Sequence, residues 1–302
     1  MTERVVVVAN PTAGRGRGGR LIGRVDRVLH EVGVPHEIRV AESGEHLLQL
    51  ARQAAQDGAE IVAALGGDGT VSLAANGVLG TDATLATLPS GTADDFAKSI
   101  GMGKLDTATR QLASPRIERI DVVRVETGTV QRHYLAVAGA GFDSEVNETA
   151  NAMRIDLGAT GTYIAAVLKT LPKFQPAIFS IELDGVRDEV SGMLVVVGNS
   201  TSYGGGMKVT PNASVVDGRL DVCIVEALTI PAFLRAFPRV FLGKHANHPR
   251  VRMATATRVR LEADRRVQVY ADGERVGPLP AVFEVLPAAL PVVIGPMAVA
   301  VR

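Results

Sequence analysis

Residues 4–101 alternate between short apolar runs and amphipathic segments that each end at a glycine. The apolar runs are RVVVVAN, PHEIRVAE, EIVAAL and TLATLP, and the segments that follow them end at Gly33, Gly58, Gly80 and Gly101. Short β-branched runs are typical of buried parallel strands, and a glycine just past a periodic segment is a helix stop signal. Strands that alternate with helices at this pace predict βαβ units, which build an open parallel sheet.

The pattern changes near residue 120, where strand signals begin to follow one another directly. Helical spacing covers residues 144–171, and the strand-like runs are RIDVVRVETGTVQRHYLAVAGAG, AIFSIELDGVRDEV, MLVVVGN, GRLDVCIVEA, RVRLEAD, RVQVYADGERV and AVFEVLP. Closely spaced strands with turn signals predict an antiparallel sandwich. We therefore expect an α/β chain with an N-terminal open parallel sheet domain over residues 1–122 and a C-terminal antiparallel β-rich sandwich domain over 123–289. Residues 290–302 can return to the first domain or stay with the second.

Composition excludes several classes of protein. Lys plus Arg and Asp plus Glu number 32 each, so the net charge gives no overall attraction to nucleic acid. The single cysteine, Cys223, excludes a disulfide framework and a Cys-based zinc site. The first apolar run is too short for a signal peptide, and no run approaches the ~20 residues of a membrane span. We expect a cytoplasmic protein without a nucleic-acid partner.

A first glycine cluster, GRGRGG at residues 14–19, formally fits the G-x-G-x-x-G dinucleotide fingerprint, with Glu37 or Glu42 as the ribose acid. Three arginines crowd the cluster, which suits neutralisation of phosphate charge better than close helix packing. An accessory phosphate loop is therefore favoured over a dinucleotide site and over a plain flexible turn. The Walker pattern G-x-x-x-x-G-K-[ST] does not occur in the chain.

The motif LGGDGT, residues 65–70, is more informative. Gly66, Gly67 and Gly69 permit positive φ and turn backbone N–H groups outward at the end of a strand, and Thr70 can cap the next helix. Asp68 would repel a phosphate unless a cation lies between them. Mg²⁺ binds a few carboxylate oxygens and otherwise water and phosphate oxygens, so Asp68 is interpreted as holding Mg²⁺, directly or through water. The alternative is an Asp-Gly turn without a ligand.

A second loop of the same kind, PSGTADDFA, follows the next strand. Gly91 and Thr92 offer an N–H and a hydroxyl at a helix start, and Asp94 and Asp95 lie in the first turn of that helix. Complementarity with the helix dipole is an alternative explanation for the two acids. Two such turns at one sheet edge favour a ligand site, because ligands of open α/β sheets bind beyond the carboxyl ends of the strands.

Four segments together resemble the bacterial diacylglycerol kinases and related lipid kinases. They are GGDGT, LPSGTADDFA, GNSTSYGGGMKVTPNASVVDGRLDV and YADGE, and the resemblance runs from NPTAG at residue 10 to GERV at 276. GGDGT is shared with the NAD kinases, whereas the other segments favour the lipid kinase branch. The resemblance implies a nucleotide-binding α/β domain, a β-rich lipid-substrate domain, and Mg²⁺-dependent transfer of the γ-phosphoryl group of ATP to a lipid hydroxyl. The most direct product is phosphatidic acid from diacylglycerol.

The resemblance also implies roles for individual residues. Nucleotide contacts are implied for Asn10, Gly66, Gly67, Asp68, Gly69, Thr70, Val71, Ser72, Gly91, Thr92 and Asp95. Metal binding is implied for Asp68 and Asp217, and for Ser214 and Arg219 through their backbone carbonyls. Glu274 is implied as the acceptor of the lipid hydroxyl proton, with Asp272 close by.

The chain departs from the family pattern at two places. Asp94 stands where the family often has Asn, and Val40 and Ala41 stand where a threonine is common, with Ser43 the nearest hydroxyl. The second departure removes a threonine that the resemblance implies as a nucleotide contact.

Three Asp-Gly pairs lie between β-runs, and Asp-Gly is a strong hairpin signal in its own right. From the residues alone Asp184, Asp217 and Asp272 each predict a structural turn. Only the resemblance separates the last two from Asp184, which we interpret as a plain turn.

Residues 230–253 contain five Arg or Lys and no acid, with Phe233, Phe237 and Phe241 recurring every four residues. A basic amphipathic element can lie on anionic lipid, but a crossover helix whose phenylalanines pack on the β-domain is favoured. Pro238 would kink such a helix. TYIAAVLKTLPKF, 162–174, is a weaker membrane candidate. The expected partners are a lipid substrate and, peripherally, the inner face of the membrane; both a monomer and a homodimer stay open.

Two other functions share the motifs. An NAD kinase would phosphorylate a soluble dinucleotide and ignore lipid vesicles. A non-catalytic nucleotide or lipid sensor would bind ATP without turnover, against which Asp272 and Glu274 argue.

Overall fold

A computed structural model describes residues 4–11, 18–153 and 158–295 of the chain. The chain forms two compact units. Unit 1 contains the residues up to Asp121 and from Ala288 onward, and unit 2 contains Val122–Pro287. The predicted fold class is confirmed, with a parallel sheet in unit 1 and antiparallel strands in unit 2.

The sheet of unit 1 has parallel strands in the order β4, β3, β1 and β2. These are β1 (Val5–Ala9), β2 (His36–Val40), β3 (Ile61–Gly66) and β4 (Thr84–Pro89). Every residue of β1, β3 and β4 is buried, as β-branched runs in a covered parallel sheet should be, whereas the edge strand β2 is partly exposed. The end of β15 pairs in parallel with β4, Val292 beside Leu85.

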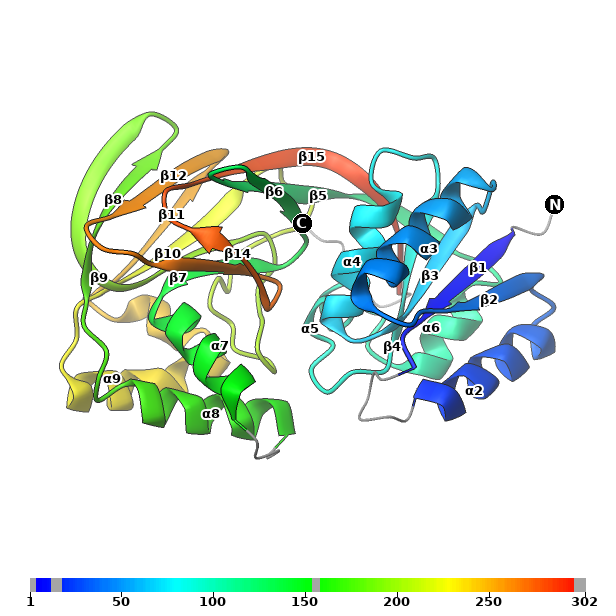
Figure 1. Ribbon diagram of the computed structural model, residues 1–302, viewed down its shortest axis with the longest axis horizontal. Helices are drawn as coiled ribbons and strands as arrows, with labels where there is room; N and C mark the ends of the chain where they lie inside the picture. The colour runs from blue at the N-terminus through cyan, green and yellow to red at the C-terminus, as the bar shows by residue number, and fades with distance from the viewer. Residues whose placement is uncertain (1–3, 12–17, 154–157, 296–302) are drawn as a thin grey trace. The chain divides into compact units, whose positions relative to one another are not determined.

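Helices cover both faces of this sheet, as Figure 1 shows. They are α2 (Gly18–Glu31), α3 (Gly44–Gln56), α4 (Asp68–Val78), α5 (Asp95–Ser99) and α6 (Leu105–Gln111). The Ser43 hydroxyl caps α3 by accepting the His46 N–H at 3.1 Å. Gly77 lets α4 approach α3, because a Cβ there would lie 2.7 Å from Cβ of Ala51.

Unit 2 is built on antiparallel strands. They are β5 (Arg116–Thr127), β6 (Val130–Tyr134), β7 (Val137–Gly141), β8 (Ala177–Leu183), β9 (Val186–Gly198), β10 (Leu220–Glu226), β11 (Val251–Ala256), β12 (Arg258–Ala263), β13 (Gln268–Ala271), β14 (Glu274–Pro278) and β15 (Ala281–Ile294). The long strand β9 pairs with β8 along its first half and with β7 and β10 along its second. β5 and β15 each begin in one unit and end in the other.

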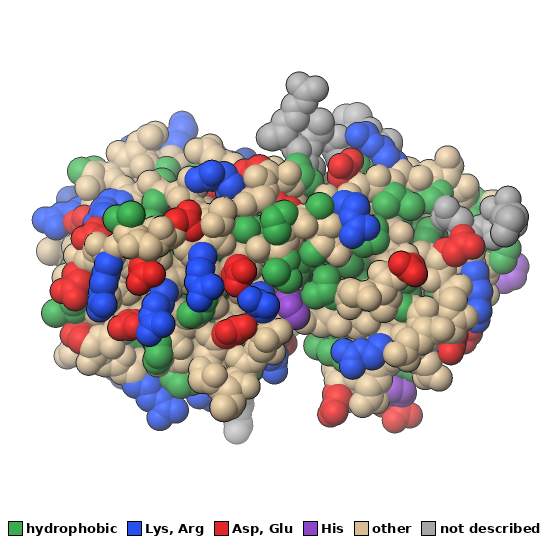
Figure 2. Space-filling model, turned by 90° about the horizontal axis from the view of Figure 1, so that it is seen from above, with side chains coloured by type: hydrophobic (Ala, Val, Ile, Leu, Met, Phe, Trp, Pro, Cys, Tyr) green, Lys and Arg blue, Asp and Glu red, His purple; other side chains and the backbone are tan. Residues whose placement is uncertain are grey.

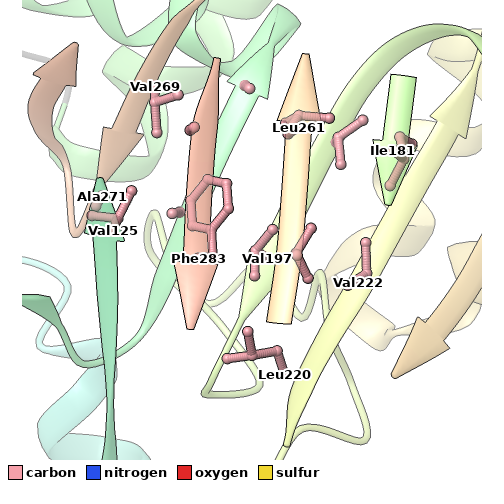
Figure 3. Close-up of a cluster of buried hydrophobic side chains, with 14 of the residues drawn as sticks. Val125, Ile181, Val197, Leu220, Val222, Leu261, Val269, Ala271 and Phe283 are labelled. Atoms are coloured by element: carbon pink, nitrogen blue, oxygen red, sulfur yellow. The ribbon is translucent and has the colours of Figure 1, made fainter. Parts of the chain in front are cut away.

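One face of these strands forms a shared core, and the opposite face is charged along strands such as β12 but buried in two further apolar clusters along β7, β9 and β10. Phe283, Val197, Leu261 and Val222 point toward one another in this core (Figure 3). Figure 2 shows basic and acidic side chains interspersed over unit 2, and ion pairs such as Arg124 with Glu284 at 2.6 Å join neighbouring strands. This alternation is expected of an antiparallel sheet with one solvated face.

Three short helices lie on one side of the strands of unit 2 (Figure 1). They are α7 (Phe142–Ala152), α8 (Gly158–Thr170) and α9 (Ile230–Ala236), and α9 continues into the 3₁₀ turns η1 (Phe237–Leu242) and η2 (Lys244–Asn247). The helix ends before Pro238, as proline requires. Within the described ranges, no helix is long and apolar enough to cross a bilayer.

Candidate functional site

Three loops meet at the carboxyl edge of the unit 1 sheet. The N–H of Asn10, just past β1, donates to the carbonyl of Leu65 at 3.1 Å, and the N–H of Ser90, just past β4, donates to the carbonyl of Gly66 at 3.0 Å. The Asn10 side-chain amide lies 3.4 Å from the hydroxyl of the buried Thr70. Asn10, the GGDGT motif and the PSGTADDFA loop are therefore neighbours at one edge.

The glycines of these loops provide space, which differs from the expectation of positive φ. Gly66, Gly67, Gly69 and Gly91 all have ordinary negative or extended backbone angles. A Cβ on Gly66 would lie 2.2 Å from the Thr70 hydroxyl, and a Cβ on Gly91 would lie 2.7 Å from Cα of Gly67. The backbones of the two loops thus touch, and any side chain would push them apart.

Asp68 joins the two loops through its carboxylate. Oδ2 accepts the N–H of Asp95 at 3.2 Å and Oδ1 accepts the N–H of Phe96 at 3.1 Å, so Asp68 caps the start of α5. Burial raises the pKa of Asp68, and the charge of Asp95 raises it further, while the two N–H bonds oppose this shift. Each oxygen keeps a lone pair, so the carboxylate suits a metal ion or its water in addition to the cap.

Asp94 adds a third carboxyl group to this loop pair. It has φ 50°, a left-handed conformation that Asn and Asp tolerate, and its Oδ1 accepts the Gly91 N–H at 3.0 Å. An Asn oxygen could accept the same hydrogen bond. The loop can therefore keep the same conformation whether this position holds Asp or the Asn that is frequent in the family. Burial raises the pKa of Asp94 to about 6, and the charge of Asp68 contributes. Carboxyl groups this close together repel one another when all of them are ionised. Their oxygens are suitable ligands for a divalent cation, whose charge would offset that repulsion.

The remaining residues of the loops differ in exposure. Thr92 is exposed, whereas Asp95 and Ser72 are buried. The Ser90 hydroxyl is buried, and among the described residues it has no hydrogen-bond partner. Sequence reasoning missed Ser90, although its place in PSGT beside Gly91 was a usable signal.

The arginine-rich cluster at residues 14–17 lies outside the described residues. The helix α2 begins at Gly18. Glu37, the acid that a dinucleotide site would use, instead accepts a hydrogen bond from Arg39 at 2.7 Å.

Asp272 is held in a turn by the backbone of the segment before β7. It has φ 47°, and its carboxylate accepts the N–H groups of Leu135, Ala136 and Val137 at 2.9, 3.0 and 3.2 Å. Asp184 has φ 48° and holds the N–H of Arg258 in the same manner at 2.8 Å. The two Asp-Gly turns are therefore alike in geometry, and the Asp272 carboxylate has a structural task.

Glu274 begins β14 and its side chain is exposed. Its neighbour in the antiparallel pairing is Ala271, so the tight turn at Asp272 presents it at the end of the hairpin. The structure thus separates the two acids by environment, one bound to backbone and one facing solvent.

Ser214, Asp217 and Arg219 lie in one turn that precedes β10. The exposed Asp217 accepts the Arg219 N–H at 3.0 Å, and Gly218 has φ 68°. Asp221, which the sequence did not single out, is buried beside them, and burial together with the charge of Asp217 raises its pKa to about 6.

An apolar pocket in unit 2 contains a buried acid that the sequence interpretation missed. Asp143, on α7, accepts hydrogen bonds from the hydroxyls of Tyr163 and, at 2.6 Å, of Tyr203. Burial raises the pKa of Asp143. The rest of the lining is mainly apolar and includes Val167, Leu194, Met207, Leu228, Phe233 and Val240. An acid directly after the strand VAGAGF was the available signal.

Two phenylalanines of residues 230–253, Phe233 and Phe237, face the interior of unit 2. Phe233 is buried and stacks on Phe237, with ring centroids 5.6 Å apart, and both line or border the Asp143 pocket. Phe233 and Phe237 therefore pack within unit 2, as the favoured interpretation of the sequence expects. The outward positions are Ile230 and Leu234, with Arg235 and Arg239 beside them.

Comparisons with known proteins agree across both units. Residues 4–125 match the family model described as the diacylglycerol kinase catalytic domain, and residues 136–294 match the one described as the YegS C-terminal NAD kinase beta sandwich-like domain. A diacylglycerol kinase of Mycobacterium tuberculosis is 35% identical over 96% of this chain and 94% of its own length. A diacylglycerol kinase of Bacillus subtilis is 27% identical, covering 93% of both chains. A crystal structure of a Bacillus anthracis protein, assigned as a diacylglycerol kinase, superposes with a TM-score of 0.82 at 25% identity, covering 98% and 96% of the two chains.

Proposed function

Because the chain belongs to the diacylglycerol kinase family, we propose that it transfers the γ-phosphoryl group of ATP to the hydroxyl of diacylglycerol and forms phosphatidic acid. The observation that carries this proposal is the meeting of three strand-end loops at the edge of unit 1, with backbone N–H groups, hydroxyls and carboxyls together.

The loops supply what phosphates need. The start of α4 presents the N–H groups of Gly69 and Thr70, and a helix N-terminus attracts anions. Ser90 offers a buried hydroxyl without a partner among the described residues. We assign Asp68 to Mg²⁺, with Asp94 and Asp95 close enough to strengthen the negative field around it. Bound Mg²⁺ would neutralise the phosphate oxygens as charge develops on them.

In unit 2, the same proposal gives the two acids of the Asp272 hairpin different tasks. Glu274 accepts the proton of the lipid hydroxyl, since its carboxylate is exposed. Asp272 positions Glu274 by fixing the turn on which it stands. Asp217, together with the backbone carbonyls of Ser214 and Arg219, would hold a second metal ion that orders their turn beside Asp221.

The Asp143 pocket is assigned to the lipid. Its apolar lining suits an acyl chain, and Asp143 with its two tyrosines offers polar atoms to the glycerol or ester end. Substrate of this kind lies in a membrane, and α8 and α9 carry exposed apolar side chains next to cations without an intervening acid. Unit 2 would therefore take its substrate while touching an anionic bilayer surface.

The test is transfer of radiolabelled phosphate from ATP to three acceptors offered separately. Diacylglycerol in anionic vesicles should be labelled in a Mg²⁺-dependent manner, and NAD should not. Labelling of NAD alone would establish the dinucleotide kinase instead. Binding of ATP without labelling of diacylglycerol or of any species in a total lipid extract would establish a sensor.

A further inference from the structure

Asp26, His30 and His36 form a cluster on unit 1, outside the loops assigned to phosphates. Asp26 and His30 lie one turn apart on α2, and His36 is the first residue of β2. Each offers a ligand atom, and these atoms all lie within 4.8 Å of one another. Within the described part of the chain, it is the one group of three His, Cys, Asp or Glu side chains with this geometry.

Two of the three distances between ligand atoms are close to those in a metal coordination shell, and the third is at most 4.8 Å. Nε2 of His36 lies 3.0 Å and Nδ1 of His30 lies 3.5 Å from Oδ1 of Asp26. Metal–ligand bonds of about 2.0–2.1 Å place adjacent ligand atoms roughly 2.9–3.4 Å apart in tetrahedral or octahedral geometry. The i, i+4 spacing of Asp26 and His30 puts both on one helix face.

The tautomer of His36 is fixed by its surroundings. Its Nδ1 lies 2.9 Å from the carbonyl oxygen of Val34, which can only accept, so Nδ1 carries the proton. In the neutral ring, Nε2 then carries a lone pair, and this lone pair points at a carboxylate oxygen of Asp26. Two acceptors at 3.0 Å need a cation between them, either a second proton on the ring or a metal ion.

The environment favours a bound ion. The His36 side chain is only 5% exposed and so is held in one orientation, whereas those of His30 and Asp26 are 73% and 49% exposed and leave a path from solvent. A metal-bound histidine commonly donates its other N–H to a backbone carbonyl, as His36 does. Nδ1 of His30 lies 3.0 Å from the carbonyl of Asp26, so His30 must give up this hydrogen bond when Nδ1 binds the ion.

We propose that Asp26, His30 and His36 bind one divalent transition-metal ion, Zn²⁺ being the best match, with water in the open positions. Two imidazoles and one carboxylate suit Zn²⁺, whereas Mg²⁺ takes oxygen ligands, so this site is separate from the ion that serves phosphoryl transfer. The ion would tie α2 to the edge strand β2 across residues 32–35 and stabilise unit 1.

Titration calorimetry of the untagged full-length chain with Zn²⁺, in excess Mg²⁺, tests the proposal. We expect one equivalent to bind and the melting temperature to rise. His30→Gln and Asp26→Asn should each weaken binding at least about tenfold, since loss of even an outer partner costs that much. His248→Gln, in unit 2, is the matched control and should bind as the parent does.

Cobalt and circular dichroism complete the experiment. Co²⁺ should give a visible d–d spectrum that Zn²⁺ displaces and that the two variants lose while keeping the far-ultraviolet spectrum of the parent. Absence of binding, or equal affinity in parent and variants, would show that the cluster is only a histidine–carboxylate ion pair.

Discussion

Asp68 has two tasks in the proposed kinase, as a cap and as a metal ligand. Asp68→Asn keeps one oxygen for the N–H groups of Asp95 and Phe96 and loses the charge that Mg²⁺ requires. We expect a modest loss of stability, about 1 kcal/mol as for other caps, and loss of nearly all turnover. Urea unfolding and a Mg²⁺ titration of turnover measure the two effects. Near-normal Mg²⁺-dependent turnover would remove Asp68 from the metal site.

Asp94 makes stability depend on pH. Its pKa is about 6 in the folded chain against an ordinary value of 3.8, so between these values the folded state binds more protons than the unfolded state. The free energy of unfolding therefore loses a contribution as pH rises from about 4 to 6. Two pKa units set its upper limit at about 3 kcal/mol, and solvent screening of this partly exposed group lowers it. Asp94→Asn should remove this loss, so that the variant gains stability over the parent toward pH 7. Urea unfolding across this range is the measurement, and parallel curves for the two proteins would contradict it.

Glu274 and Asp272 should have different effects on turnover and stability when they are replaced one at a time. Glu274→Gln should leave ATP affinity and stability unchanged and lower turnover by at least about a hundredfold, the low end for a lost general base. Asp272→Asn should lose stability by roughly 1–3 kcal/mol, because an amide cannot satisfy the three N–H groups of residues 135–137 equally well.

Asp184→Asn is the matched control for Asp272, since the two turns share their geometry. It should lose stability to a similar degree and keep its turnover. If Asp272→Asn is stable and inactive while Glu274→Gln turns over normally, Asp272 is the base.

At the scale of elements, α9 presents to solvent a face different from the phenylalanine stripe. Ile230 and Leu234 are 43% and 42% exposed, with Arg235 and Arg239 beside them. Leu234→Ser combined with Arg235→Glu and Arg239→Glu should reduce co-sedimentation with anionic vesicles and leave labelling of a detergent-dispersed lipid intact.

Val186→Ser is the control for that prediction, because Val186 is 72% exposed on the distant β8–β9 hairpin. Equal sedimentation of all three proteins would exclude α9 from the membrane contact.

The elements that the sequence predicts well are those whose signal is local. β1, β3 and β4 are continuous apolar runs, and their burial follows from composition alone. Asp68 caps α5 through Asp95 and Phe96, which lie 27 and 28 positions further along the chain. No local sequence pattern encodes contacts at that separation. The Asp143 pocket likewise depends on Tyr163 and Tyr203, 20 and 60 positions away. Local motifs therefore mark the loops that we propose bind phosphates, whereas tertiary contacts determine the hydrogen bonds that each acid in them makes.

At the scale of the whole molecule, unit 1 is completed by residues from the far end of the described chain. Leu290, Val292, Val293 and Ile294 are each at most 2% exposed, and the N–H of Gly295 donates to the carbonyl of Ile100 at 2.9 Å. Val292→Asp would bury an unpaired charge next to β4. We expect unit 1 to become protease-sensitive while fragments from residues 122–287 persist.

Val186→Asp, at an exposed position, is the control and should digest like the parent. Simultaneous loss of both units in Val292→Asp would show that they unfold together.

The pairing of the end of β15 with β4 has a consequence during synthesis. A nascent polypeptide that has emerged from the ribosome up to residue 287 holds every strand of unit 2 between β6 and β14, but it lacks the neighbour that β4 requires. Unit 2 can therefore mature first although it is encoded second, and the parallel sheet that precedes it must wait with an open apolar edge. Translation would impose an order of folding opposite to the order of the sequence, and the interval in which chaperones could bind this edge ends only when β15 is released.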